Sequence, residues 1–147
     1  MSRIRIRRMQ QQDVVQAAAL EAQIFSLPWS EQAFSDALKL THTVFLVAEE
    51  GGSVAGYIGM YLSLEEGEIT NVAVAPEFRR RGIADALLTE IKREAAECGV
   101  TSLVLEVRVS NQNAIRLYEK HGFVSCGVRK GFYEQPKEDA FLMILGQ

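Results

Sequence analysis

The chain has 147 residues, 48% of them hydrophobic and 24% charged, and its formal net charge is −3. This length suits one domain with a packed core, the acidic balance disfavours direct binding to nucleic acid, and no apolar run approaches the roughly 20 residues that span a bilayer. We therefore expect residues 1–147 to form a single cytoplasmic domain without membrane attachment.

The first half of the sequence predicts an edge strand, two helices and three further strands. Isoleucine alternates with arginine over residues 4–6, which is the period of a strand, and residues 13–25 are then apolar at helical spacing. Ser30 is placed to cap a second helix that runs to residue 40. Three strands follow, over residues 43–48, 54–62 and 69–75. Gly51-Gly52 marks a tight hairpin between the first two, so we expect an antiparallel meander.

The second half predicts two more helices and three strands. Apolar residues recur at helical spacing from Ile83 until Gly99 stops that helix. Residues 101–109 are typical of a strand, and Ser110 is expected to cap a helix that ends near residue 121. The last two strands are predicted over residues 123–128 and 140–145. This order of elements predicts an α/β (α+β) fold, in which a mixed sheet carries helices on both faces.

The junction between the third meander strand and the next helix has the features of a phosphate-binding turn. Arg79, Arg80 and Arg81 supply positive charge, and Gly82 and Ala84 keep side-chain bulk away from the free amides at the start of the helix. An ordinary turn with a solvated arginine run, or a weak nucleic-acid patch, explains the same residues. The spacing matches neither a dinucleotide fingerprint nor a P-loop, so a phosphate ligand of another type is favoured.

Glu106 interrupts the otherwise apolar strand predicted at residues 101–109. An ionised carboxylate within such a strand is costly unless it is paired or lies near a cleft. Glu106 is therefore a candidate general base, whose pKa burial would raise. The structural alternative is an ion pair with Arg108, which lies two residues further along the same strand face.

The helix after this strand carries a stripe of residues that can face one ligand. Asn111, Ala114, Ile115 and Tyr118 follow i, i+3, i+4 and i+7 spacing. An amide near the helix start can bond a polar cofactor arm, and a phenol two turns later can donate a proton to a leaving group. In the structural alternative, Tyr118 is a core aromatic and Asn111 a local cap.

The remaining reactive residue types have structural explanations. Cys98 and Cys126 form neither a disulfide framework nor a zinc motif, and we expect buried or half-buried thiols. His42 and His121 lack a second set of ligands, so no metal site is predicted. Trp29 follows a proline between the first two helices and is expected to anchor the core.

Two motifs together resemble the GNAT superfamily of N-acetyltransferases. They are R-x-x-G-x-A at Arg79, Gly82 and Ala84, and S-N-x-x-A-x-x-L-Y-x-x-x-G-F from Ser110 to Phe123, and the order of elements matches along the whole chain. The resemblance implies a mixed, mostly antiparallel sheet of about seven strands with a V-shaped splay between its two central strands. It also implies acetyl-CoA as co-substrate, with no metal, and an acetyl group held at the splay.

The resemblance assigns roles to individual residues. It places the cofactor on Val72, Ala73, Val74, Arg79, Arg80, Arg81, Gly82, Ile83, Ala84 and Asn111. It makes Glu106 the catalytic base and Tyr118 the catalytic acid. The region of Trp29 and Tyr133 would border the acceptor.

Within the superfamily, three segments resemble bacterial enzymes that acetylate the N-terminal alanine of a small-subunit ribosomal protein. They are residues 27–30, residues 105–111 and the tail with Arg129, Tyr133 and Glu138, although Phe132 stands where these enzymes usually have a second tyrosine. The resemblance implies that the partner is the N-terminus of a ribosomal protein. We also expect the enzyme to be a monomer. Two alternatives remain open: an acetyltransferase for a small amine or a protein lysine, and an acyl-CoA-binding regulatory domain without turnover.

Overall fold

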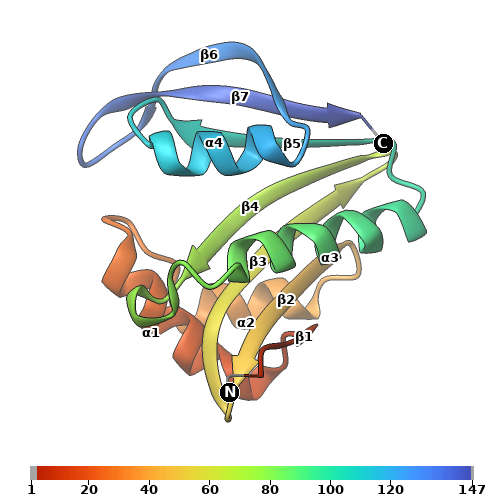
Figure 1. Ribbon diagram of the computed structural model, residues 1–147, viewed down its shortest axis with the longest axis vertical. Coiled ribbons are helices and arrows are strands. Elements are labelled where there is room, and N and C mark those ends of the chain that lie inside the picture. The colour runs from red at the N-terminus through yellow and green to blue at the C-terminus, as the bar shows by residue number, and fades with distance from the viewer. Residues whose placement is uncertain (1–2, 147) are drawn as a thin grey trace.

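The computed structural model describes residues 3–146 as a seven-stranded mixed sheet with helices on both faces (Figure 1). The strands are β1 (Arg5–Arg8), β2 (Thr43–Glu50), β3 (Ser53–Ser63), β4 (Glu66–Val74), β5 (Ser102–Arg108), β6 (Val124–Tyr133) and β7 (Glu138–Gly146). The α-helices are α1 (Val14–Ile24), α2 (Glu31–Lys39), α3 (Ile83–Glu97) and α4 (Gln112–Lys120), and short 3-10 helices lie at Gln11–Asp13 and Pro76–Phe78. The sheet order β1-β2-β3-β4-β5-β7-β6 confirms the predicted edge strand and meander.

The sheet separates into two halves at its only parallel pairing among the described residues. Strands β4 and β5 pair from Glu66–Ser102 to Glu68–Val104 and no further, and Figure 1 shows them diverging beyond that point. A β-bulge lies at the same place, because Asn71 faces Gly59 and Ile69 faces Met60, which leaves Thr70 as the extra residue. A bulge bends the strand that contains it and increases its twist. The expected V-shaped splay is therefore confirmed.

Each face of the sheet has its own hydrophobic core. On one face, α3 buries Leu87, Leu88 and Ile91 completely against the meander. On the other, Phe34 of α2 and Tyr57 of β3 pack edge to face, with ring centroids 5.5 Å apart, beneath α1. The two layers confirm the expected helices on both faces and fix α3 and α4 on the side opposite to α1 and α2.

Two helix caps test the turn predictions. The Ser30 hydroxyl accepts a hydrogen bond from the Ala33 amide at 3.0 Å, as predicted. The prediction that Ser110 caps α4 was wrong, because the helix starts one residue later and Asn111 Oδ1 accepts from the Ala114 amide at 3.2 Å. The Ser110 amide instead donates to Glu138 Oε2 at 2.8 Å.

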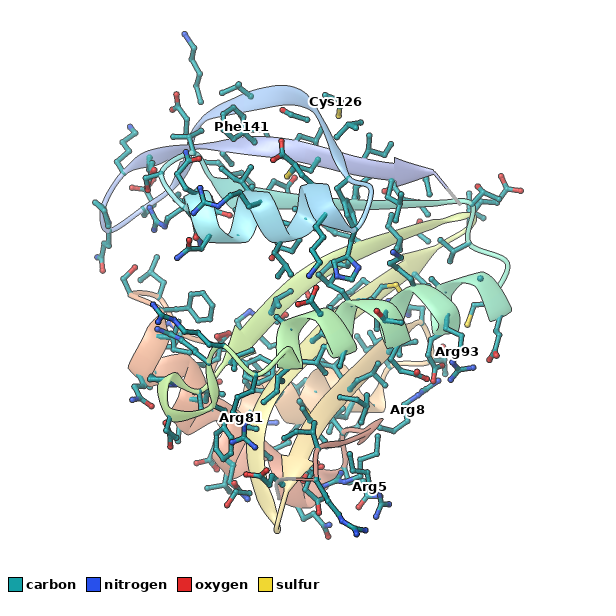
Figure 2. The ribbon with its side chains drawn as sticks, viewed as in Figure 1. Arg5, Arg8, Arg81, Arg93, Cys126 and Phe141 are labelled. Carbon is teal, nitrogen blue, oxygen red and sulfur yellow. The ribbon has the colours of Figure 1, made fainter. Side chains whose placement is uncertain are left out.

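The C-terminal hairpin and the cysteines differ from the sequence predictions. Strands β6 and β7 are both longer than expected, and most residues of β6 are exposed. Cys98 and Cys126 are exposed as well, so the prediction of buried thiols was wrong. Cys98 follows the last turn of α3, and Figure 2 shows Cys126 on the outer side of β6, the last strand of the sheet. Among residues 3–146, no helix is long and apolar enough to cross a membrane.

Candidate active site

A cleft of about 750 Å³ opens where β4 and β5 diverge. Its walls come from β4, β5, the first turn of α3, one side of α4, the end of α1 and the β6–β7 hairpin. Most of the predicted site residues line it, namely Trp29, Val72, Ala73, Val74, Arg79, Ala84, Glu106, Asn111, Tyr118 and Tyr133. Residues from distant parts of the sequence therefore meet in one cavity.

Four predicted residues do not line this cleft. Ile83 is 2% exposed and belongs to the core, while Arg80 is exposed on the turn with a positive φ of 64°. Arg81 Nη2 pairs with Glu50 Oε2 at 2.5 Å, and Figure 2 shows Arg81 on the side of the α3 start that faces away from the opening. Gly82 is the N-cap of α3.

The start of α3 has the backbone geometry of an anion site. Gly82 has φ 75°, a left-handed conformation that other residues adopt at a cost, and a Cβ placed there would meet nothing within 4 Å. Because the N-cap is a glycine, no side chain at that position bonds the first amides of the helix. Arg79 and Ala84 face the cleft beside these amides. A diphosphate group fits this combination of free amides, helix dipole and guanidinium.

Glu106 lies in the wall of the cleft and pairs across the sheet. The residues of β5 alternate between buried and half-buried, and the Glu106 side chain is 11% exposed. The alternative pair with Arg108 is absent among residues 3–146: Arg108 pairs with Glu138 at 3.1 Å, whereas Glu106 Oε2 lies 3.1 Å from Arg129 Nε. Burial raises the pKa of the Glu106 carboxyl, and the Arg129 charge opposes this rise.

Tyr118 is both a core aromatic and a wall of the cleft. It is 8% exposed and packs on Phe123, with ring centroids 5.9 Å apart. Burial, and then the neighbouring Tyr133, raise the pKa of Tyr118 far above its usual value, so the phenol keeps its proton. Tyr133 lines the same cleft, and burial, followed by the Glu106 charge, raises its pKa to about 12.

Trp29 and Asn111 each make a structural contact and also line the cleft. The Trp29 ring packs against Phe34 and Phe45, at 5.2 and 5.9 Å between centroids, and also lines the cleft. Asn111 lines the cleft while its side-chain oxygen caps α4. His121, by contrast, bonds Asp85 at 2.9 Å between the two helices, as a structural residue does.

Sequence reasoning missed the part that three polar residues play near this site. Glu21 lines the cleft from α1 and is 3% exposed, and Asn71, at the bulge of β4, is 5% exposed. Glu21 had a signal in the sequence, because it continues the apolar i, i+3, i+4, i+7 stripe that begins at Val14. Arg129 belongs to the tail that carries the resemblance, but its pairing with Glu106 could not be predicted, because that pairing depends on the order of the strands.

A splayed sheet with a helix start suited to an anion on one side, and with a carboxylate and a phenol lining the same cleft, is the architecture of an acyl-group transferase. The family model "Acetyltransferase (GNAT) family" matches residues 14–123, and the chain belongs to this family. It is an acetyltransferase.

Several relatives have names that specify which amine they acetylate. The chain is 34% identical over 135 residues to the [ribosomal protein bS18]-alanine N-acetyltransferase of Escherichia coli K12, covering 90% of both chains. It is 35% identical over 137 residues to the N-alpha-acetyltransferase RimI of Mycobacterium tuberculosis, covering 89% of this chain and 85% of the relative. The crystal structure of the ribosomal-protein-S18-alanine N-acetyltransferase from Escherichia coli aligns with a TM-score of 0.90 at 32% identity, over 98% of this chain and 94% of the other.

Proposed function

We propose that this enzyme transfers an acetyl group from acetyl-CoA to the α-amine of the N-terminal alanine of ribosomal protein bS18, in the cytoplasm and as a monomer. The observation that carries the proposal is that Glu106 and Tyr118, from separate elements, line the same cleft at the splay. A relative named for that activity matches 90% of the chain, and one named as an N-alpha-acetyltransferase matches 89%. We place the acceptor between Trp29 and Tyr133, which line the cleft on its α1 and hairpin sides.

The cleft suits acetyl-CoA along its length. We assign the diphosphate to the amides at the start of α3, with Arg79 beside them, and the pantetheine arm to the splayed edge of β4 at residues 72–74. That edge has no β5 partner beyond Glu68, so alternate backbone groups are free to bond a ligand. When bound, acetyl-CoA supplies the acetyl group as a thioester.

In the proposed mechanism, the acceptor amine attacks the thioester carbonyl directly and Glu106 accepts the proton that the amine loses. Free N–H groups on the splayed edge of β4 stabilise the oxyanion that develops on the carbonyl. Tyr118, protonated at all ordinary pH values, donates a hydrogen bond and then its proton to the departing sulfur. No cysteine takes part, which agrees with the positions of Cys98 and Cys126 outside the lining of the cleft.

The energetics favour an α-amine over a lysine as acceptor. A reference α-amine has a pKa near 8 and a lysine side chain near 10.4, so deprotonating lysine costs about 3 kcal/mol more. Burial raises the pKa of the Glu106 carboxyl, but a carboxylate is still a weak base. It is therefore better matched to an α-amine than to a lysine side chain.

The decisive experiment compares acceptors with the purified enzyme and acetyl-CoA. We expect transfer of the acetyl group to peptides that begin with the free N-terminal alanine of bS18. Mass spectrometry identifies the modified residue. N-terminally blocked peptides containing lysine, and polyamines, serve as the comparison. Transfer to these acceptors alone would overturn the proposal, and CoA binding without transfer to any amine would identify a regulatory domain.

The helix-start glycine gives a test of the cofactor site. We expect Gly82→Leu to abolish measurable CoA binding in calorimetry, because a side chain enters the open space at the α3 amides and strains a positive φ of 75°. Gly99→Leu is the matched control, since Gly99 also has a positive φ of 81° and open space but lies at the other end of α3. Equal loss in both variants would show that helix strain, rather than the site, is responsible.

The Glu106–Arg129 pair allows the role of Glu106 as the general base to be tested from the pH dependence of kcat/KM. The carboxylate must be ionised to accept a proton, so activity falls as pH drops through the pKa of Glu106. Because the Arg129 charge lowers that pKa, Arg129→Gln should move the acidic limb of the kcat/KM profile to higher pH. Arg8→Gln breaks a similarly exposed arginine pair, with Glu94, and should leave the limb in place. If the acidic limb does not move in Arg129→Gln, it reports the titration of a group other than Glu106.

A further inference from the structure

Glu21 is a buried acid whose presence the proposed reaction leaves unexplained. It lies on α1 and is 3% exposed, and no ion pair to it is found among residues 3–146. The other buried carboxylate, Asp13, receives two hydrogen bonds from Arg7. A buried carboxylate without a cation costs free energy, and burial raises the pKa of Glu21 accordingly. Such a residue in the lining of a cleft calls for a functional reason.

The polar contacts of Glu21 lead to the bulge of β4. Asn71 Nδ2 donates a hydrogen bond to Glu21 Oε1 at 3.1 Å, and Asn71 Oδ1 accepts one from the Thr70 hydroxyl at 2.6 Å. Thr70 is the extra residue of the bulge. Glu21 is thus connected through Asn71 to the residue at which β4 leaves its regular pairing with β3.

The carboxylate of Glu21 lies near another buried polar group, the hydroxyl of Tyr57. Glu21 Oε2 and the Tyr57 hydroxyl are both buried, and neither makes a hydrogen bond of normal geometry with the described residues. Burial, and then the nearby Glu21 charge, raise the pKa of Tyr57. The Trp29 amide also approaches the carboxylate. Glu21 therefore joins α1, β3, the bulge of β4 and the connection to α2.

The position of the bulge gives this cluster a role in the reaction. The bulge comes two residues after the last β4–β5 pair, at Glu68, and immediately before the splayed edge at residues 72–74. An extra residue in a strand reverses which side the following backbone groups face. The orientation of the free N–H groups in the cleft thus depends on the conformation at Thr70 and Asn71. Oxyanion donors must be held close to one geometry, because small displacements cost much of their effect.

We propose that Glu21 is a positioning residue: it holds Asn71, and through Asn71 the bulge of β4, so that the splayed edge presents its N–H groups to the thioester carbonyl. The inference rests on the proposed function, because it assigns Glu21 to the same transfer reaction. Glu21 acts through its hydrogen bond to Asn71 and contacts neither co-substrate. The carboxylate oxygen that accepts this bond matters more than its charge.

Two substitutions separate the hydrogen bond from the charge. Glu21→Gln keeps an oxygen that can accept from Asn71 and should retain kcat within about fivefold, whereas Glu21→Ala removes the bond and should lower kcat by about tenfold to a hundredfold. The dissociation constant for acetyl-CoA should remain unchanged in both. Asn71→Ala should match Glu21→Ala, and the double variant should be no slower than either single variant, since both remove the same connection.

Gln16→Ala is the matched control, because Gln16 Oε1 also joins α1 to the sheet, accepting from the Val54 amide at 2.8 Å away from the bulge. It should lower the melting temperature about as much as Glu21→Ala and leave kcat unchanged. Wild-type kcat in a folded Glu21→Ala variant would overturn the inference. So would a Glu21→Gln variant as slow as Glu21→Ala with a raised acceptor KM, since Glu21 would then bind the amine by its charge. If the wild-type enzyme itself acetylates no α-amine, the proposed function fails instead.

Discussion

Replacing Glu106 by glutamine should lower kcat by about 10²–10⁴ while leaving the acetyl-CoA dissociation constant within about twofold of wild type. The amide keeps the size of the carboxylate but cannot accept the proton that the amine must lose. Burial and the nearby Glu68 charge keep the pKa of Glu106 raised, so the wild-type carboxylate is a stronger base than an exposed one. Stopped-flow or steady-state transfer assays combined with calorimetry measure both quantities.

Glu94→Gln is a close control for this change. Glu94 is also half-buried, with a side chain 16% exposed, and pairs with the exposed Arg8 at 2.6 Å, but it lies on α3 outside the cleft. It should turn over at the wild-type rate. A Glu106→Gln variant with wild-type turnover would remove Glu106 from the mechanism and direct attention to Tyr133, the other titratable group near the splay.

Tyr118→Phe should slow turnover by about 10²–10⁴ without loss of acetyl-CoA affinity. The change removes only the hydroxyl, so the packing against Phe123 remains. Because burial holds the phenol in its protonated form, the effect arises from a lost donor to the leaving sulfur and not from a lost charge. The deficit should shrink with an acyl donor whose leaving thiol is more acidic, which needs less help to depart.

Tyr61→Phe is the corresponding control, since Tyr61 is a half-buried tyrosine of β3 whose pKa burial also raises, and it does not line the cleft. We expect wild-type kcat from it. If Tyr118→Phe and Tyr61→Phe behave alike, Tyr118 is only a core aromatic, as its neighbour Phe123 is.

The elements that the sequence predicts correctly are those whose signal is local. The helical stripe of α3 and the glycine pair between β2 and β3 are both fixed by neighbouring residues, because side-chain periodicity and positive φ act over a few positions. The Ser30 cap is local in the same way. At α4, serine and asparagine are both good caps and stand side by side, so the sequence leaves the starting residue undecided by one position.

Two of the differences from the sequence analysis depend on strand order. The structural alternative for Glu106 was a pair along its own strand with Arg108, yet its partner is Arg129 on β6, which the sheet order brings to the same region with β7 between β5 and β6. The same order makes β6 the outermost strand, which exposes Cys126. The candidate site was predictable for a different reason: its motifs resemble a superfamily whose geometry is shared. Glu21 belongs to neither motif, and only its place on an apolar stripe distinguished it.

The short contact between β4 and β5 also determines where the protein begins to unfold. Three residue pairs join the two halves of the sheet there, whereas β2 and β3 share eight. A break at this seam therefore forfeits the fewest interstrand bonds, and partial opening should precede global unfolding at this place. The opening that admits a substrate therefore lies at the least stable contact between the two halves of the sheet. Mutations that add bonds across this opening should raise the melting temperature and lower turnover.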